Sequence, residues 1–313
     1  MFISEGLVEQ HIHGAFGIDF MNCSKDELIE AAKQLAQLGV TAFFPTIMTD
    51  NILKIKERID IIKKAMQIKE EKIAQIAGIH LEGPFINPEK SGIHEKKYIQ
   101  PLNIDIFKEI EDEALKIVTL APELDLNGKF IKYLKSKNIK ISAGHCNCSD
   151  LSKVNQVTHL YNAMGAFNHR TPSTVVSSLI NDEIFTEIIA DSKHVNDDVL
   201  KITFKQKPIN KILFISDALP LAHSNKQEHI FAGQTIYNKN GNLVSNDGTI
   251  AGSSMLLCDI IKNVVNKKLF TLNEAIKVSS TNQLKYHSLK NNLKLCWNKK
   301  TNLITNVEFI KIN

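Results

Sequence analysis

Histidines and carboxylates end four apolar runs along the chain, and residues of these types suggest a metal site. The four clusters are His11-Ile-His13, His80-Leu-Glu82, Gly144-His145 and Thr158-His159. Imidazoles and a carboxylate delivered from the ends of successive strands suit a catalytic divalent ion, whereas an ordinary core excludes so many polar groups. The pattern therefore predicts a metal-dependent hydrolase.

Glu82 is the most informative of these residues. It ends an apolar run and precedes Gly83-Pro84, so its carboxylate would be buried and would need a cation or hydrogen bonds. With His145 and His159 it forms a ligand set that leaves one position open for water on zinc or a similar ion. A single buried histidine is usually a hydrogen-bonded core residue, so the interpretation depends on the three side chains meeting.

Two further features extend this site. His11 and His13 alternate along a strand, so both side chains face the same way and allow a second ion; a polar pair without metal is the alternative. Asp217 directly follows a hydrophobic run. Because Ala218-Leu219-Pro220 does not suit the start of a helix, we interpret Asp217 as a general acid/base rather than as an N-cap.

The elements that position these residues alternate between short β-rich runs and longer amphipathic stretches. The eight runs are Leu7–His13, Val40–Thr46, Ile76–Glu82, Ile117–Ala121, Ile139–Ala143, Gln156–Leu160, Phe185–Ala190 and Ile212–Asp217. This order predicts an α/β fold, a (β/α)8 TIM-like barrel, in which the carboxyl ends of all strands share one rim. A doubly wound sheet is the alternative, but it does not explain why polar residues recur at so many strand ends.

The remaining segments depart from the alternation. Residues 1–290 are expected to form the catalytic barrel, with a β-hairpin insertion near 228–250 that turns at Asn240-Gly241. Helices are expected at Met255–Asn266 and Leu272–Thr281. Residues 291–313 are expected to form a C-terminal β remnant with strands at Leu293–Trp297 and Val307–Ile312.

Composition fits one enzyme-sized unit. The 313 residues are 43% hydrophobic and carry a formal charge of +4, spread through mixed lysine and glutamate segments rather than gathered into a nucleic-acid footprint. Five cysteines without regular spacing indicate free thiols in a reducing compartment. We see no leader peptide before the first β-rich run. Every apolar stretch is also well short of the roughly 20 residues that span a bilayer. We therefore expect a cytoplasmic protein without nucleic-acid or membrane partners.

Several motifs, taken together and in this order, resemble the N-acetylglucosamine-6-phosphate deacetylases of the amidohydrolase superfamily. They are His80-Leu-Glu-Gly-Pro-Phe85, Gly92-Ile-His94, Ala143-Gly-His145, Thr158-His-Leu-Tyr-Asn-Ala-Met164 with Arg170, Ala190-Asp-Ser-Lys-His-Val195, Ser216-Asp-Ala218 and Gly248-Thr-Ile-Ala-Gly-Ser253.

The resemblance implies a role for each matching residue. Glu82, His145 and His159 are implied to bind one divalent ion, most simply Zn²⁺ with Fe²⁺ as the alternative, and His11 and His13 a second. Asp217 is implied to be the catalytic acid/base, and His94, next to Ile93, to lie against the substrate carbonyl. The phosphate is implied to meet Asn162, Ala163, Arg170 and His194, with the arginine supplied by the other subunit of a homodimer. Ile250, Ala251 and Gly252 match a loop that closes over the sugar.

The implied reaction is deacetylation of N-acetylglucosamine 6-phosphate to glucosamine 6-phosphate and acetate in amino-sugar catabolism. The galactosamine epimer and a catalytically impaired sugar-phosphate-binding protein are the alternatives. A dihydroorotase-like enzyme is disfavoured because Thr119–Glu123 lacks the bridging lysine. Two departures from the family stand out: the accessory β-sandwich is expected to be reduced or absent, and Asp191-Ser192 replaces the usual Asp-Gly pair.

Overall fold

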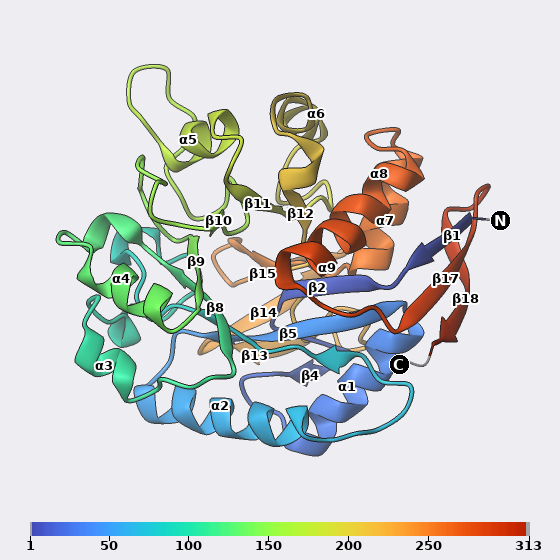
Figure 1. Ribbon diagram of the computed structural model, residues 1–313, viewed down its shortest axis with the longest axis horizontal. Helices are drawn as coiled ribbons and strands as arrows, with labels where there is room; N and C mark the ends of the chain where they lie inside the picture. Colours follow the sequence, from blue (N-terminus) through green and yellow to red (C-terminus); the bar gives the residue numbers. More distant parts are fainter. Residues whose placement is uncertain (1, 311–313) are drawn as a thin grey trace.

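Eight parallel strands form the wall of a barrel in the computed structural model, which describes residues 2–310 (Figure 1). Each strand is hydrogen-bonded to the next along the chain, and a short strand β6, Gln75–Ile76, pairs beside β5. The eight are β2 Leu7–Ile12, β5 Val40–Met48, β7 Ile79–Glu82, β8 Leu115–Leu120, β9 Lys140–Ala143, β10 Gln156–Val157, β11 Phe185–Ile188 and β12 Ile212–Phe214. The predicted (β/α)8 fold is confirmed.

The barrel closes at its carboxyl end, where the segment after β12 meets β2. The amide of Asp217 donates to the carbonyl of His11, and the amide of His13 donates to the carbonyl of Ala218, both at 2.9 Å. These bonds hold two of the predicted site residues beside the catalytic carboxylate candidate. Closure of the wall and construction of the site therefore use the same backbone.

Helices cover the outside of the barrel, and local signals explain their bounds. Ser24 and Glu27 form a capping box at the start of the first helix, whose inner face buries Leu28 and Leu35. The α-helices are α1 Lys25–Gln37, α2 Ile52–Met66, α3 Ile104–Lys108, α4 Lys129–Ser136, α5 Thr174–Ile180, α6 Asp197–Gln206, α7 Leu257–Asn266, α8 Leu272–Ile276 and α9 Asn282–His287. The helix predicted to end at Thr281 instead continues through a π-helical segment, Lys277–Thr281, into α9.

Several predicted strands are shorter than expected, among them Phe185–Ala190, which ends at Ile188, and Ile212–Asp217, which ends at Phe214. The run Ile76–Glu82 is divided between β6 and β7, because Gly78 adopts a φ of 152° against the Lys116 side chain. The run Gln156–Leu160 is a regular strand only over its first two residues, although the amides of Thr158 and Leu160 still donate to the carbonyls of Ala143 and Glu187. A tiny two-stranded ribbon, β3 Gly14–Ala15 and β4 Ile18–Asp19, follows β2.

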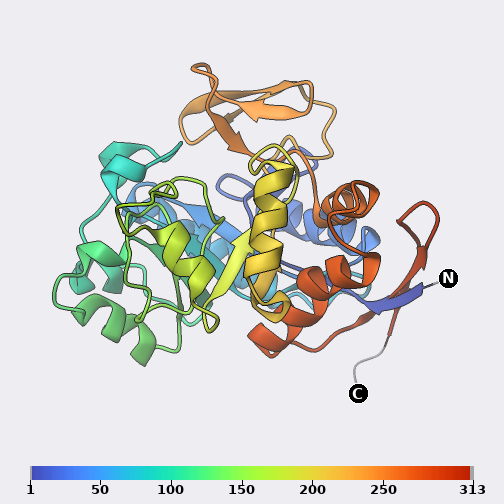
Figure 2. The ribbon, with the colours of Figure 1, turned by 90° about the horizontal axis from the view of Figure 1, so that it is seen from above.

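The insertion near 228–250 is a four-stranded antiparallel sheet rather than a single hairpin, so that prediction is wrong in its strand count. Its strands are β13 Glu228–Phe231, β14 Gln234–Lys239, β15 Asn242–Val244 and β16 Ile250–Gly252. The predicted Asn240-Gly241 turn is present, with φ values of 55° and 82° that match a tight hairpin turn. Figure 2 shows this sheet as a separate layer beside the barrel.

A second small sheet joins both ends of the chain. Strand β17, Leu293–Asn298, lies between β1, Phe2–Glu5, and β18, Leu303–Phe309. Ile304 and Leu295 pack closely over Gly39, where β5 begins, so this sheet lies against the amino end of the barrel. The β18 strand was predicted to reach Ile312, and residues 311–312 lie outside the described residues.

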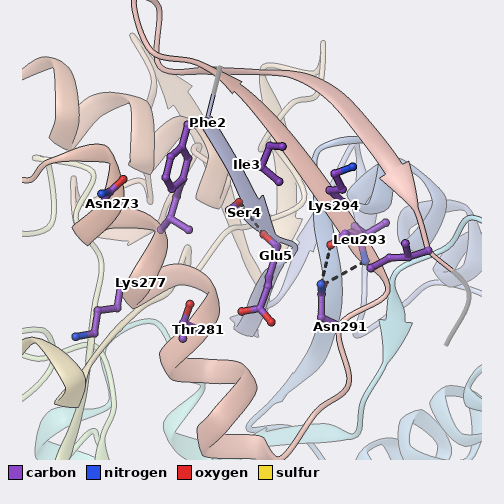
Figure 3. A pocket seen from close by; sticks show the side chains of 12 residues that line it. Phe2, Ile3, Ser4, Glu5, Asn273, Lys277, Thr281, Asn291, Leu293 and Lys294 are labelled. Carbon is purple, nitrogen blue, oxygen red and sulfur yellow. Dashed lines mark hydrogen bonds between the residues drawn. The ribbon is translucent and has the colours of Figure 1, made fainter. Parts of the chain in front are cut away.

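A groove of about 600 Å³ separates β1 from α8 and the π-helical segment. Figure 3 shows Phe2 and Glu5 of β1 on one side of it and Asn273, Lys277 and Thr281 on the other. None of the metal-ligand candidates lines this groove. Among the described residues, no helix combines the length and the apolar character that crossing a bilayer requires.

Candidate active site

A cavity of about 170 Å³ lies at the carboxyl rim of the barrel and gathers most of the predicted site residues. Met48, which was not predicted, and Thr249, which lies in the Gly248–Ser253 motif but was not selected as a site residue, line it as well. Arg170, Gly252 and the fully buried His11 are not among its lining residues. The predicted residues that line it are His13, Glu82, Ile93, His94, His145, His159, Asn162, Ala163, His194, Asp217, Ile250 and Ala251.

Strand ends position the chemistry, and the backbone there is unusual. Glu82 is the last residue of β7, whereas His145, His159 and Asp217 each follow a strand by a few residues. These three have φ values of 48°, 29° and 51°, in the left-handed region that non-glycine residues rarely occupy. Such conformations cluster where a structure must aim a functional side chain.

Glu82 lies at the centre of the site. Its Oε1 lies 3.0 Å from His159 Nε2 and 3.3 Å from His145 Nε2, and the two imidazole nitrogens lie 3.1 Å apart. Ligands about 2.0 Å from a tetrahedral ion are separated by about 3.3 Å, so these three atoms have the spacing of one coordination shell. The sequence-predicted ligand set is therefore brought together.

The hydrogen-bond partners show why a cation suits this spacing. His145 Nδ1 faces the carbonyl oxygen of Lys90 at 2.8 Å, and a carbonyl only accepts, so the neutral ring carries its proton there. Its Nε2 then presents a lone pair to His159 Nε2 and to Glu82. Lone pairs at this distance repel one another, and a positive ion among them removes the conflict.

A second set of ligand atoms adjoins the first. His11 Nε2 lies 3.3 Å from His13 Nε2, and Asp217 Oδ1 lies 3.3 and 3.2 Å from these two nitrogens. The other oxygen of Glu82 lies 3.3 Å from His13 Nε2, so this carboxylate faces both sets. Burial raises the pKa of Asp217, but the charges of His11 and His13 outweigh it and hold this pKa well below its usual value.

His94 lies on the rim beside these groups. Its Nδ1 is 2.7 Å from the Thr49 hydroxyl, and its Nε2 points toward Glu82 Oε2 at 3.4 Å. Burial, together with the charge of His145, lowers the pKa of His94 to about 4. A neutral ring whose Nδ1 accepts from Thr49 presents an Nε2 proton to the cavity, which suits a carbonyl oxygen.

The opposite side of the cavity is suited to an anion. His194 Nδ1 lies 2.8 Å from Asp191 Oδ2, and Asp191 also accepts from the hydroxyl of Ser253. Burial lowers the pKa of His194, but the hydrogen bond and charge of Asp191 outweigh it and raise this pKa overall. Ser192, which replaces the expected glycine, adopts a φ of 64° and accepts a hydrogen bond from Asn263.

Arg170 is not brought into the site within one chain. It lies in an exposed loop after β10, where its Nε contacts His169 at 3.0 Å. Asn162 does line the cavity, and its amide donates to the carbonyl of His159. The predicted closing segment Ile250–Gly252 forms β16, whose first two residues line the cavity.

The sequence interpretation missed a polar interior beneath the rim. Glu187, Gln10 and Gln156 are fully buried within barrel strands and hydrogen-bond to one another. Glu9 is also buried, accepts from the amide of Ser216, and has a pKa that burial raises to about 8. The available signal was a charged residue in the middle of an apolar strand, as in Phe185-Thr-Glu-Ile188, because such a group needs buried partners.

His80, which the sequence grouped with Glu82, is not part of the ligand set. Its Nδ1 contacts the carbonyl of Gln10 at 2.9 Å and its Nε2 contacts the Thr119 hydroxyl at 2.7 Å. Burial and the charge of His11 lower the pKa of His80 to about 4. Both of its nitrogens are therefore engaged by protein groups.

Relatives of known identity agree with this geometry. The N-acetylglucosamine-6-phosphate deacetylase of Caenorhabditis elegans is 32% identical over 286 residues, covering 82% of this chain and 68% of that protein. The chain belongs to the N-acetylglucosamine-6-phosphate deacetylase family. The Bacillus subtilis enzyme of this family is 34% identical over 260 residues, which cover 79% of the chain. The matched part spans about two thirds of these relatives' length, 66% for the bacterial one.

Solved structures of the deacetylase family share the fold. The N-acetylglucosamine-6-phosphate deacetylase of Thermotoga maritima superposes with a TM-score of 0.86 at 26% identity, covering 98% of this chain and 87% of that one. No protein-family model matches the chain. The resemblance carried by the sequence motifs is thus confirmed by comparison of sequences over about four fifths of the chain and by comparison of folds.

Proposed function

We propose that the protein hydrolyses the acetamide of N-acetylglucosamine 6-phosphate, releasing glucosamine 6-phosphate and acetate. The observation that carries the proposal is the convergence of Glu82, His145 and His159 with Asp217 in one cavity that ends at His194. Membership of the deacetylase family supports the same reaction. The galactosamine epimer differs at one hydroxyl, and the substrate assay below compares the two.

Glu82, His145 and His159 would hold a divalent ion, for which zinc fits the nitrogen and oxygen donors and iron(II) is the alternative. A second ion would lie between His11, His13 and Asp217. A divalent ion at this rim supplies a Lewis acid and makes a water molecule more acidic.

Asp217 is suited to moving the proton of this reaction. Among the described residues that line the cavity, only Asp217 and Glu82 are carboxylates, and Glu82 is enclosed by five histidines. Asp217 would take the proton of the attacking water and deliver it to the departing amine, which leaves poorly without one. His94 would donate its Nε2 proton to the carbonyl oxygen as negative charge develops there.

The phosphate would bind at the opposite end. His194, kept charged by Asp191, offers a charge-assisted hydrogen bond. Arg170 would complete this site from the other subunit of a homodimer. Arg58 and Arg170 are the only arginines in this lysine-rich sequence, and Arg58 is buried, donating to the carbonyl of Cys23. A guanidinium can bind a phosphate through two parallel hydrogen bonds, and Arg170 is the arginine that lies in an exposed loop.

An apolar surface beside this loop supports the homodimer. Phe167, Ile180 and Ile202 are 67%, 68% and 59% exposed and line one groove together with Leu179. Exposed apolar patches of this kind mark surfaces that other proteins cover.

The five cysteines are all unpaired, which supports the proposal of a reducing, cytoplasmic location.

We retain the predicted division of the chain as part of the proposal. Residues 1–290 would be the catalytic barrel and 291–313 the remnant of the accessory domain, to which β1 adds one strand. Phe2 of β1 pairs with Trp297 of β17, so both ends of the described chain contribute to this small sheet.

The test is an assay of amine and acetate release by the metal-loaded protein. We expect turnover of N-acetylglucosamine 6-phosphate above that of the galactosamine epimer and far above that of unphosphorylated N-acetylglucosamine. Asp217→Asn protein, loaded with the same metal, serves as the control for contaminating enzyme. Binding of the phosphorylated sugar without any release of acetate would identify a sugar-phosphate-binding protein instead.

A further inference from the structure

Glu187 is a buried carboxylate for which the proposed reaction has no use. It lies in β11, on the far side of His11 from the cavity, and no part of it is exposed. Burying a carboxylate costs free energy unless protein hydrogen bonds replace those to water. The hydrogen-bond partners of Glu187 therefore indicate which groups it positions.

Four donors surround the two oxygens of Glu187. Oε1 accepts from the side-chain amides of Gln10 and Gln156, the latter at 3.0 Å. Oε2 lies 3.1 Å from His11 Nδ1 and 3.3 Å from the backbone amide of His159. One carboxylate therefore contacts the side chain of one metal-ligand candidate and the backbone of another.

The contact with His11 fixes which nitrogen of that ring carries the proton. A carboxylate only accepts hydrogen bonds, so a neutral His11 ring, as in a metal ligand, holds its proton on Nδ1, and Nε2, which faces His13 and Asp217, is the nitrogen left to bind an ion. A carboxylate behind a metal-bound imidazole orients the ring and increases its strength as a ligand.

We propose that Glu187 is the positioning residue that makes His11 an Nε2 ligand, and that it thereby allows a second divalent ion beside Asp217. This inference rests on the proposed metal site and concerns its second ion only. Glu187 is not itself a ligand, because the other nearby imidazole, His80, has both nitrogens engaged by Gln10 and Thr119.

The substitution Glu187→Gln tests the proposal with almost no change in volume. The amides of Gln10 and Gln156 would keep the new side chain's oxygen on their side, so its NH2 group would face His11 Nδ1. His11 would then accept at Nδ1 and carry its proton on Nε2, where it blocks a metal bond. Loss of such a partner typically weakens metal affinity about 10 to 100-fold.

The measurement is titration of metal-free protein with Mn²⁺, followed by electron paramagnetic resonance and by native mass spectrometry. In the wild type we expect two ions, with the second altering the signal of the first through magnetic coupling. In Glu187→Gln we expect the first ion to bind as before and the second to bind about 10 to 100-fold more weakly.

Glu9→Gln is the matched control, because Glu9 is an equally buried carboxyl on β2 that accepts hydrogen bonds from Ser216 and from the backbone amide of His11 rather than from its ring. It should retain both ions. If Glu9→Gln loses the second ion as Glu187→Gln does, then weakened binding is a general result of changing the barrel interior, and the proposal is overturned. Two ions bound with wild-type affinity by Glu187→Gln would overturn it too.

If Glu187→Gln is not recovered folded, Gln156→Met removes one of the donors that anchor Glu187 and leaves His11 untouched. Gln156→Met should weaken binding of the second ion by a smaller factor than Glu187→Gln does, and unchanged binding would reject the proposal. Wild-type protein that binds a single Mn²⁺ and still releases acetate would reject the role of Glu187 while the proposed deacetylation stands. Protein that binds no ion and releases no acetate would remove the proposed function as well.

Discussion

The two ends of the cavity are built differently. At the metal end, atoms of Glu82, His145 and His159 lie within 3.3 Å of one another on residues that end or closely follow barrel strands. At the phosphate end, His194 follows β11 in a loop, and Arg170 lies in an exposed loop that does not reach the cavity. In the proposed function, the first end is complete within a single chain, whereas the second would take Arg170 from a partner chain.

This difference agrees with what each end would do in the proposed function. Ligands of a metal must be held to within a fraction of an ångström, and strands fixed by a closed barrel provide that precision. A sugar phosphate must enter and leave, so the groups that bind it are suited to loops and to a layer such as the four-stranded sheet, β13–β16. Perturbing the metal end should therefore abolish chemistry, and perturbing the phosphate end should change affinity.

The largest effect is expected for removal of a metal-end ligand. His159→Ala should release the first ion and lower deacetylation by about 10⁴-fold, since a catalytic ion contributes several kcal/mol to the transition state. Metal content by mass spectrometry and acetate release measure this. His223→Ala, a histidine outside the cavity that pairs with Asp259, should leave both unchanged. A wild-type protein still fully active after exhaustive chelation would contradict the metal assignment.

Asp217→Asn should have the next largest effect, because asparagine keeps the volume of the side chain but cannot exchange its proton. We expect kcat to fall by about 10² to 10⁴-fold while KM changes little. The first ion should remain bound, because Asp217 is not one of its three ligands. Turnover within a few-fold of the wild type would remove Asp217 from proton transfer.

The contrast between the two ends also explains how much the sequence could predict. Glu82, His145 and His159 were predictable because strand ends converge in a barrel whatever the details of packing. Glu187 was missed because it lies in the middle of a strand, where an apolar run hides a single carboxylate. The four-stranded sheet was predicted as one hairpin because the Asn240-Gly241 turn marks only β14 and β15, whereas β13 and β16, of four and three residues, are too short to show an alternating pattern.

At the phosphate end, loops limit how much of the site could be predicted from the sequence. Nothing in the order of residues shows whether the Arg170 loop turns toward its own cavity or away from it, because loop geometry depends on local turns rather than on a repeating pattern. Only the resemblance to a family suggested a second subunit. The exposed position of Arg170 agrees with that suggestion, and the homodimer stays a prediction.

Arg170→Ala should change affinity rather than chemistry. Loss of a charge-assisted hydrogen bond to phosphate should raise KM for N-acetylglucosamine 6-phosphate about 10 to 100-fold. Metal content should not change, and Lys132→Ala, an exposed lysine of α4 away from the cavity and from the apolar groove, should behave as the wild type.

Mixing Arg170→Ala with Asp217→Asn chains tests whether the arginine crosses between subunits. A mixed dimer would contain one site with an intact Asp217 and a partner-supplied arginine, so part of the activity should return. Absence of rescue, in samples that native mass spectrometry shows to contain mixed dimers, would place the arginine in its own chain's site or outside the mechanism. A strictly monomeric active protein would also reject the shared site.

The smallest expected effect is a pH dependence confined to the phosphate end. Asp191 raises the pKa of His194 above its usual value, so the imidazolium persists to higher pH and is lost as the pH rises past that raised pKa. A sugar phosphate is mostly doubly charged above about pH 6. Its affinity should therefore be greatest between about pH 6 and the pKa of His194, and should fall at more alkaline pH.

The other charged groups that influence His194 are Asp191, Lys193 and Asp217. Binding of N-acetylglucosamine 6-phosphate is best measured by calorimetry in Asp217→Asn protein, which removes the titration of that carboxylate and slows turnover. Adding His194→Gln should weaken binding about tenfold below the pKa of His194 and abolish the alkaline fall. If the fall persists without His194, another group controls it, and the phosphate end would depend on pH for a reason other than the Asp191–His194 pair.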